Sequence, residues 1–201
     1  MRFLDFVTEN WSSVSSQDFI LHESTENLIE ILESLPVLEK SRGFIELSPG
    51  VGKSILSTVL YPAWLWLHCG QSNLRFLCVH GSGHLATLNS KLFNCFMSKL
   101  GFIRVRVNSA NSVENICGGQ RVATRLGLVL GHGCDVLILD NVFPVGRYSS
   151  GLEKSSAIAA FHNAAMKVSA LGSIVVVESP PGLIRALNES GHGHPASASP
   201  D

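Results

Sequence analysis

A short glycine-containing loop at residues 48–54 (SPGVGKS) constrains the fold of this chain more than any other feature. It follows an apolar run at residues 43–47 and precedes a hydrophobic stretch at residues 55–60. This order predicts a strand, a tight loop and a helix. Consecutive backbone N–H groups in such a loop can point at one anion, and a helix N-terminus attracts negative charge. We therefore expect a phosphate-binding loop here.

The end of the loop supplies the side chains that a nucleoside triphosphate requires. Lys53 can reach the terminal phosphates, and the hydroxyl of Ser54 can hold Mg²⁺. The full pattern G-x-x-x-x-G-K-[ST] has a glycine where this chain has Leu47, so the motif is degenerate. The alternative is a Gly-Pro turn that happens to precede a lysine and a serine, but the strand and helix context favours ATP binding. The predicted ATP-binding residues of the loop are Pro49, Gly50, Val51, Gly52, Lys53 and Ser54.

A second motif is the apolar run at residues 134–140 (CDVLILD), which ends in a carboxylate. Its composition fits a strand buried on both faces of a parallel sheet. Asp140 would then emerge at the carboxyl end of the strand, beside the phosphate-binding loop. By itself such a run is often only a strand end before a turn. The two motifs in this order predict a Mg-ATP site in which Ser54 and Asp140 hold the metal.

Further predicted strands and helices alternate along the chain. This alternation favours an α/β fold, a P-loop NTPase-like three-layer sandwich with a mainly parallel central sheet. The predicted helices cover residues 23–35, 85–100 and 157–168, and the predicted strands cover residues 74–79, 103–107 and 173–178.

Length and composition fit one domain of this type. The chain has 201 residues and a hydrophobic content of 45%, enough for a sizeable core. We expect the domain to cover residues 1–189, with residues 1–40 as a helical lead-in, and the tail at residues 190–201 to be disordered. The net charge of −1 neither supports nor excludes a DNA-binding surface.

Cysteine and histidine usage gives no sign of a metal site or of export. The five cysteines form no C-x-x-C pair, which indicates buried reduced thiols. The histidines lack cysteine or carboxylate neighbours at ligand spacing. No secretory signal pattern is present at the N-terminus. The most hydrophobic stretch, residues 55–69, is too short to span a membrane and contains Pro62. We therefore expect a cytoplasmic protein without membrane contact.

A glycine-rich stretch before the acidic strand is the most distinctive pattern in the chain. It runs as GGQRVATRLG at residues 118–127 and GHGCD at residues 131–135. By itself it is a pair of glycine-rich hairpins with a structural role. Together with His22 before a predicted helix and with the loop at residues 48–54, it resembles the N-terminal ATPase domain of the large terminase subunit of tailed bacteriophages. The resemblance covers residues 19–189.

The resemblance implies a packaging motor in the cytoplasm of an infected bacterial host. Terminases use ATP hydrolysis to drive double-stranded DNA into a preformed capsid, as a homo-oligomeric ring of subunits docked on the portal protein and working with a small terminase subunit. The implied catalytic residues are Lys53, Asp140 and Glu178. The resemblance also makes Arg121 and Arg125 candidates for subunit or phosphate contacts.

The chain departs from the family pattern at several positions. Asn141 stands where the family has a second acid, and Gly50 stands where the loop has an arginine. Glu178 could supply a carboxylate near the γ-phosphate, although a strand-end residue facing solvent is the alternative. The family's nuclease domain has no counterpart in the sequence, so we expect no DNA cleavage unless a separate nuclease chain supplies it.

Two functions follow from these matches and departures. The first is a packaging ATPase that hydrolyses ATP. The second is a nucleotide-binding remnant or structural subunit of a split or decayed terminase, which the substitutions at Gly50 and Asn141 would explain. A helicase or another P-loop motor shares the two nucleotide motifs, but the sequence has no recognisable helicase motifs downstream.

Overall fold

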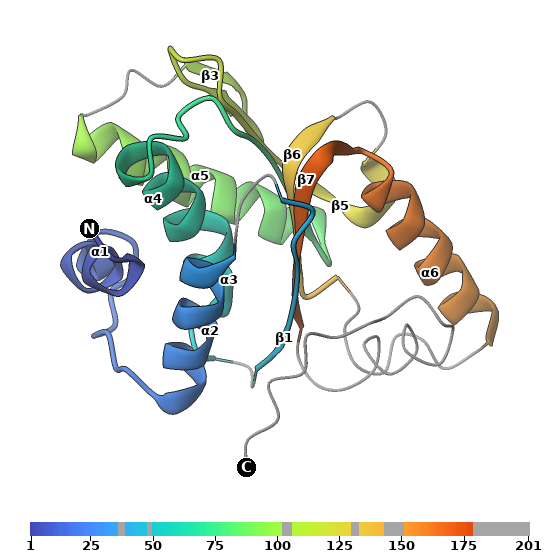
Figure 1. Cartoon of the computed structure of the whole chain (residues 1–201), viewed down its shortest axis with the longest axis horizontal. Helices are drawn as coiled ribbons and strands as arrows, with labels where there is room; N and C mark the ends of the chain where they lie inside the picture. Colours follow the sequence, from blue (N-terminus) through green and yellow to red (C-terminus); the bar gives the residue numbers. More distant parts are fainter. Residues whose placement is uncertain (36–38, 48–49, 102–105, 130–132, 143–150, 179–201) are drawn as a thin grey trace.

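A seven-stranded sheet forms the centre of the protein, and helices cover both of its faces (Figure 1). The computed structural model describes residues 1–35, 39–47, 50–101, 106–129, 133–142 and 151–178. The strand order is β1-β7-β6-β2-β5-β4-β3. The strands are β1 (Arg42–Glu46), β2 (Arg75–His80), β3 (Arg106–Ser109), β4 (Ser112–Glu114), β5 (Gln120–Arg125), β6 (Cys134–Asp140) and β7 (Val168–Glu178).

The first five strands in this order are parallel to one another, and the last two add an antiparallel edge. The β2 and β6 strands lie in the middle, and nearly all of their side chains are buried. A strand covered by helices on both faces needs apolar side chains in both directions, which is why these strands read as continuous hydrophobic runs. The predicted three-layer fold with a mainly parallel sheet is confirmed.

The helices divide unequally between the two faces of the sheet. Figure 1 shows α1 to α5 on one side and α6 on the other. Each face has its own hydrophobic core, one that includes Phe3, Trp66 and Phe93 and one that includes Phe161. The helical segments are α1 (Phe3–Asn10), η1 (Trp11–Ser13), α2 (Glu23–Ser34), α3 (Lys53–Ile55), η2 (Leu56–Leu60), α4 (Tyr61–His68), α5 (Gly83–Leu100), η3 (Leu126–Leu128) and α6 (Gly151–Ala165).

Most predicted elements are present with small shifts of their ends. The last helix ends at Ala165, and residue 168, predicted to be helical, begins strand β7 instead. Of the strand predicted at residues 103–107, the structure describes only the part from Arg106 onward. The predicted tail at residues 190–201 lies outside the described residues, so the domain limit at residue 189 stays a prediction. Within the described part of the chain, the helices are all too short or too polar to span a membrane.

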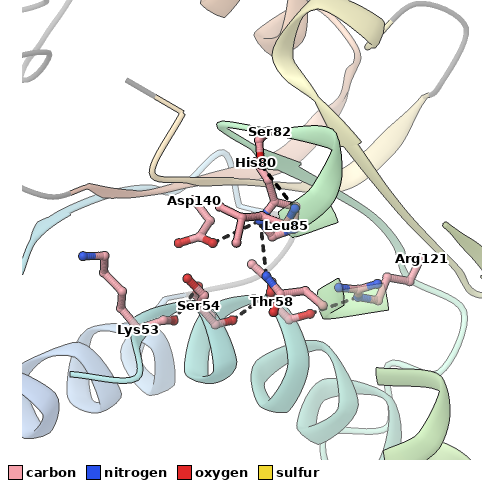
Figure 2. A network of polar contacts seen from close by, with 10 residues as sticks. Lys53, Ser54, Thr58, His80, Ser82, Leu85, Arg121 and Asp140 are labelled. Atoms are coloured by element: carbon pink, nitrogen blue, oxygen red, sulfur yellow. Dashed lines mark hydrogen bonds and ion pairs between the residues drawn. The ribbon is translucent and has the colours of Figure 1, made fainter. Parts of the chain in front are cut away.

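The helix that follows the predicted phosphate-binding loop is interrupted by a π-helical segment, η2, between α3 and α4. Pro62 explains part of this irregularity, because proline has no N–H and cannot donate to the carbonyl of Thr58 four residues earlier. Arg121 on β5 supplies a donor, with its Nε 2.9 Å from the Thr58 oxygen. The side chain of Arg121 therefore ties the loop helix to the sheet (Figure 2).

The guanidinium of Arg121 is fully buried, at 0% exposure, in this contact. Its central carbon lies 4.6 Å from the ring centre of Phe93, a cation–π arrangement. Burial lowers the pKa of the guanidinium, and no carboxylate within the described ranges forms an ion pair with it. The carbonyl of Thr58 and the aromatic face therefore replace part of the hydration that this cation has lost.

We expect Arg121→Met to lower the free energy of unfolding by about 1–3 kcal/mol, because the Thr58 carbonyl loses its side-chain donor inside the protein. In a Pro62→Ala background residue 62 has an N–H, so the same substitution should cost less. Urea denaturation of the four proteins of this double-mutant cycle measures the coupling. Equal losses in both backgrounds would show that Arg121 does not compensate for the proline.

Candidate functional site

The carboxyl ends of the parallel strands meet at one edge of the sheet, and polar side chains gather there. In the strand register, His80 at the end of β2 lies opposite both Asp140 of β6 and Arg125 of β5. At the other end of this row, Glu46 of β1 lies opposite Glu178 of β7. Ligands of open α/β sheets bind at this edge, which is also where the loop after β1 leads into α3.

The described part of the loop between β1 and α3, residues 50–52, has a backbone suited to phosphate binding. Gly50 and Gly52 both have positive φ angles, of 88° and 77°, which glycine adopts without strain. Val51 between them is half-buried, and Pro49 lies outside the described residues. The backbone N–H groups of such a turn and of the helix that follows can converge on one anion.

An aromatic side chain from the N-terminal segment lies against this loop. A Cβ atom at Gly52 would come 2.6 Å from a ring carbon of Trp11, so no larger residue fits there without movement. Trp11 is buried, its indole N–H donates to the carbonyl of Gln17 at 2.9 Å, and its ring packs on Phe19. The N-terminal segment thus forms the wall behind the loop, a contact that the sequence motifs did not predict.

The lysine and serine of the motif begin the loop helix. Lys53 is only 7% exposed, and its Nζ donates to the carbonyl of Leu47 at 3.3 Å. Ser57 and Thr58 in the next turn donate their hydroxyls to the carbonyls of Lys53 and Ser54, at 2.8 and 2.7 Å. Figure 2 shows the side chains of Lys53 and Ser54 below Asp140, facing the same space. These contacts hold the first turn of the helix in place.

Asp140 is a deeply buried carboxylate at this edge, with 1% exposure. One oxygen, Oδ2, lies 3.0 Å from Nδ1 of His80, while Oδ1 has no hydrogen-bond partner among the described residues. A buried polar atom without a hydrogen-bond partner is costly. A hard cation that prefers oxygen ligands, such as Mg²⁺, fits this orphaned oxygen beside the hydroxyl of Ser54.

The position after Asp140 is held in an unusual conformation. Asn141 has a φ of 49°, and its N–H donates to the carbonyl of Val177 at 2.8 Å. A Cβ atom at Gly81 would clash with the carbonyl oxygen of Asn141, so the ends of β2 and β6 touch. The side-chain oxygen of Asn141 is buried without a hydrogen-bond partner in the described part of the structure. Asparagine and aspartate tolerate this backbone region better than other residues with side chains.

His80 is the residue of this site that the sequence motifs did not indicate. Its spacing from other residues suits no metal site, and the sequence assigns it no other role. The available signal was a polar residue at the end of an otherwise apolar strand, in the position that Asp140 occupies on β6. The structure pairs the two strands in parallel and so brings their last residues together.

The candidate arginines have different positions in the structure. The predicted subunit or phosphate contact is wrong for Arg121, because this side chain lies inside the core and donates a hydrogen bond to the carbonyl of Thr58. Arg125 is exposed at the carboxyl end of β5, so its role stays a prediction. The backbone of Glu178 ends β7 at the same edge as Asp140, but its side chain is not described.

Comparison with solved structures gives matches to phage packaging proteins. The large terminase of bacteriophage HK97 matches 100% of this chain and 44% of its own, with a TM-score of 0.65 and 13% identity. The large terminase of a thermophilic bacteriophage, in complex with ADP, matches 81% of this chain and 39% of its own, with a TM-score of 0.51 and 16% identity. The bacteriophage phi-29 genome packaging motor assembly matches 78% of this chain and 48% of its own, with a TM-score of 0.53 and 14% identity.

The chain therefore has the fold of the ATPase domain of phage large terminases. It spans less than half of the length of the three proteins named above. At these sequence identities the structural similarity shows the fold alone. The activity has to be inferred from the residues of the site. The sequence itself matches no protein-family model and no curated protein. The resemblance found in the sequence motifs is confirmed at the level of the fold.

Because Trp11 packs against Gly52 and not against Gly50, we expect substitutions at the two glycines to differ in their effect on stability. Gly52→Ala and Gly50→Ala both place a side chain at positive φ, at a cost of about 1–2 kcal/mol. Only the first also meets Trp11, because a Cβ atom at Gly50 has open space around it. We expect Gly52→Ala to be about 1–3 kcal/mol less stable than Gly50→Ala. Thermal unfolding of both variants tests this, and equal stabilities would exclude the packing contact.

Proposed function

We propose that this chain is the ATPase domain of a phage DNA-packaging motor of the large-terminase class, which binds Mg-ATP and hydrolyses it to move double-stranded DNA into a capsid. One observation carries the proposal: a buried carboxylate oxygen of Asp140 without a partner among the described residues faces the lysine and serine of a phosphate-binding loop. The shared fold with large terminases, one of them in complex with ADP, supports the same conclusion.

Each residue of the site has a distinct part in nucleotide binding. The backbone of Gly50, Val51 and Gly52 would surround the phosphates. Lys53 would exchange the carbonyl of Leu47 for a terminal phosphate oxygen, so its ammonium group keeps a hydrogen-bond acceptor when the nucleotide leaves. Ser54 and Asp140 would hold Mg²⁺, which offsets charge that develops on the phosphates in the transition state.

Hydrolysis also needs a group that orients the attacking water or accepts its proton. Asn141 can orient a water through its amide, but it accepts a proton far less readily than a carboxylate. Glu178 at the end of the neighbouring strand β7 is the proposed source of a carboxylate, since Val177 lies opposite Asp140 in the register. Arg125 is the proposed cation that contacts phosphate or an adjacent subunit.

The partners follow from the same class of motor. We propose a ring of identical subunits on a portal protein, with double-stranded DNA as the substrate that moves, a small terminase subunit as an accessory and a separate chain for any nuclease step. The phi-29 match is named as a motor assembly for genome packaging. The proposed location is the cytoplasm of the infected bacterium.

Asn141 favours a second candidate function, a nucleotide-holding subunit that does not hydrolyse ATP. In this case the loop, Lys53 and Asp140 keep their roles in binding. The two functions differ only in turnover. Titration of Mg-ATP into the protein by calorimetry, followed by phosphate release with and without double-stranded DNA, separates them. DNA-stimulated release supports the motor, binding without release supports the holding subunit, and no binding contradicts both.

Lys53→Ala should weaken Mg-ATP binding about tenfold to a hundredfold, because one charge-assisted hydrogen bond to phosphate is worth about 1.5–3 kcal/mol. Isothermal titration calorimetry measures the effect. Lys99→Ala, which removes an exposed lysine from the far end of α5, is the control and should bind as the unsubstituted protein does. Unchanged affinity in Lys53→Ala would contradict the site assignment.

Asn141→Asp should raise the rate of phosphate release if the rest of the catalytic site is intact, because it restores a carboxylate next to Asp140. Aspartate also tolerates the positive φ of this position better than glutamate, so Asn141→Glu should give a smaller gain and a lower melting temperature. A general base contributes about 10²–10⁴-fold to such reactions. A protein that binds Mg-ATP and gains nothing from the aspartate would be a holding subunit.

A further inference from the structure

His80 is a fully buried histidine at the carboxyl ends of the parallel strands, beside the proposed nucleotide site. It is 0% exposed and ends strand β2, directly opposite Asp140 in the register. The residues before it in β2, from Phe76 to Val79, are buried and apolar. A polar ring in such a place is costly unless it has a specific partner, and the partner is the carboxylate of Asp140.

The direction of the hydrogen bond between the two side chains follows from chemistry. The distance from His80 Nδ1 to Asp140 Oδ2 is 3.0 Å. A carboxylate that binds a cation is ionised and only accepts hydrogen bonds, so in the metal-binding form of the site Nδ1 carries the proton and donates it. Oδ2 is thereby occupied, and Oδ1 is the oxygen left without a partner among the described residues.

The surroundings keep the ring of His80 where it is. Asn89 from α5 is buried beside the ring, with its amide nitrogen 3.5 Å from Nδ1 of His80. Both of these nitrogens are donors when Nδ1 carries its proton, so this is a packing contact and not a second hydrogen bond. The next residue, Gly81, packs against the carbonyl of Asn141 so closely that a Cβ atom would clash. Figure 2 shows His80 and Asp140 side by side above the turn that carries Lys53 and Ser54.

We propose that His80 is a positioning residue for the metal of the nucleotide site: its Nδ1–H holds Oδ2 of Asp140, which leaves Oδ1 directed at the cation. This inference rests on the proposed function, because it assumes that a divalent metal binds with the nucleotide. Groups that hold a metal ligand in place from outside the coordination shell typically contribute about 10- to 100-fold to metal affinity. His80 does not itself contact the metal or the phosphates.

A purely structural role is the competing explanation, since the same bond would also satisfy a buried carboxylate. The two roles differ in what they affect. A structural role changes the loop and the core, so its loss weakens nucleotide binding with and without metal. A positioning role changes only the metal-dependent part of binding.

Three substitutions of His80 separate these roles. His80→Asn keeps an amide N–H near the place of Nδ1, whereas His80→Gln carries its amide farther out, near the place of Nε2. His80→Leu has no donor. If the leucine variant does not fold, the comparison of the two amides still decides. His84→Leu removes an exposed histidine four residues later as the control, and Asp140→Asn gives the reference for loss of the ligand itself.

Two measurements at one pH apply to every variant: the Kd of ADP in EDTA, and the Kd of Mn²⁺ for the protein–ADP complex by electron paramagnetic resonance. We expect His80→Leu and His80→Gln to bind Mn²⁺ about 10- to 100-fold more weakly, with ADP affinity in EDTA within about twofold of the unsubstituted protein. His80→Asn and His84→Leu should keep most of the Mn²⁺ affinity.

Two results would overturn the inference while leaving the proposed function standing. One is a Mn²⁺ affinity in the leucine and glutamine variants equal to that of the unsubstituted protein. The other is an equal loss of ADP affinity in EDTA, which marks a structural role. If the unsubstituted protein binds no Mn²⁺ with ADP, the proposed function fails and the inference falls with it.

Discussion

The parallel pairing of β6 with β2 and β7 is the constraint on which the rest of the structure depends. The β2 and β6 strands are buried on both faces, so apolar side chains fill them almost to their last residues. In these two strands the buried charged side chain and the buried histidine, Asp140 and His80, stand at the last position. Asp140 and His80 meet at that point because the register places them opposite each other. The loop helix packs against the same sheet, and its first turn brings Lys53 and Ser54 beneath them (Figure 2).

The loop helix is joined to the sheet by contacts that compensate for its irregular backbone. Pro62 removes one donor, and the buried cation of Arg121 supplies another to the carbonyl of Thr58. The hydroxyls of Ser57 and Thr58 bond to the carbonyls at the start of the helix. The predicted phosphate-binding loop therefore has Trp11 packed behind it, and the π-helical segment that follows its first turn is joined to the sheet by Arg121. A packaging motor that transmits force from this loop to the sheet would use the same contacts.

The proposed nucleotide site has groups suited to binding a metal, but beside Asp140 it has an amide where hydrolysis would use a carboxylate. Asp140 is held by a buried neighbour and keeps one oxygen available, which suits metal binding. The next position carries an amide in place of a carboxylate, and its backbone is fixed by Val177 and Gly81. Under the proposed ATPase function, a carboxylate that accepts the proton of water would come from another strand end, such as Glu178. The proposed positioning by His80 concerns the binding of the metal and not the hydrolysis step.

The sequence by itself determined the local chemistry: the loop with Lys53 and Ser54, the acidic strand end at Asp140 and the alternation that gives a three-layer fold. These signals are local, because a strand, a turn and a phosphate-binding backbone depend on neighbouring residues. Only the tertiary structure decided that His80 contacts Asp140, that Trp11 forms the wall behind Gly52, and that Arg121 serves the core rather than a subunit interface. Each of these depends on strand order and register, which bring together residues far apart in the chain, and no local pattern encodes that pairing.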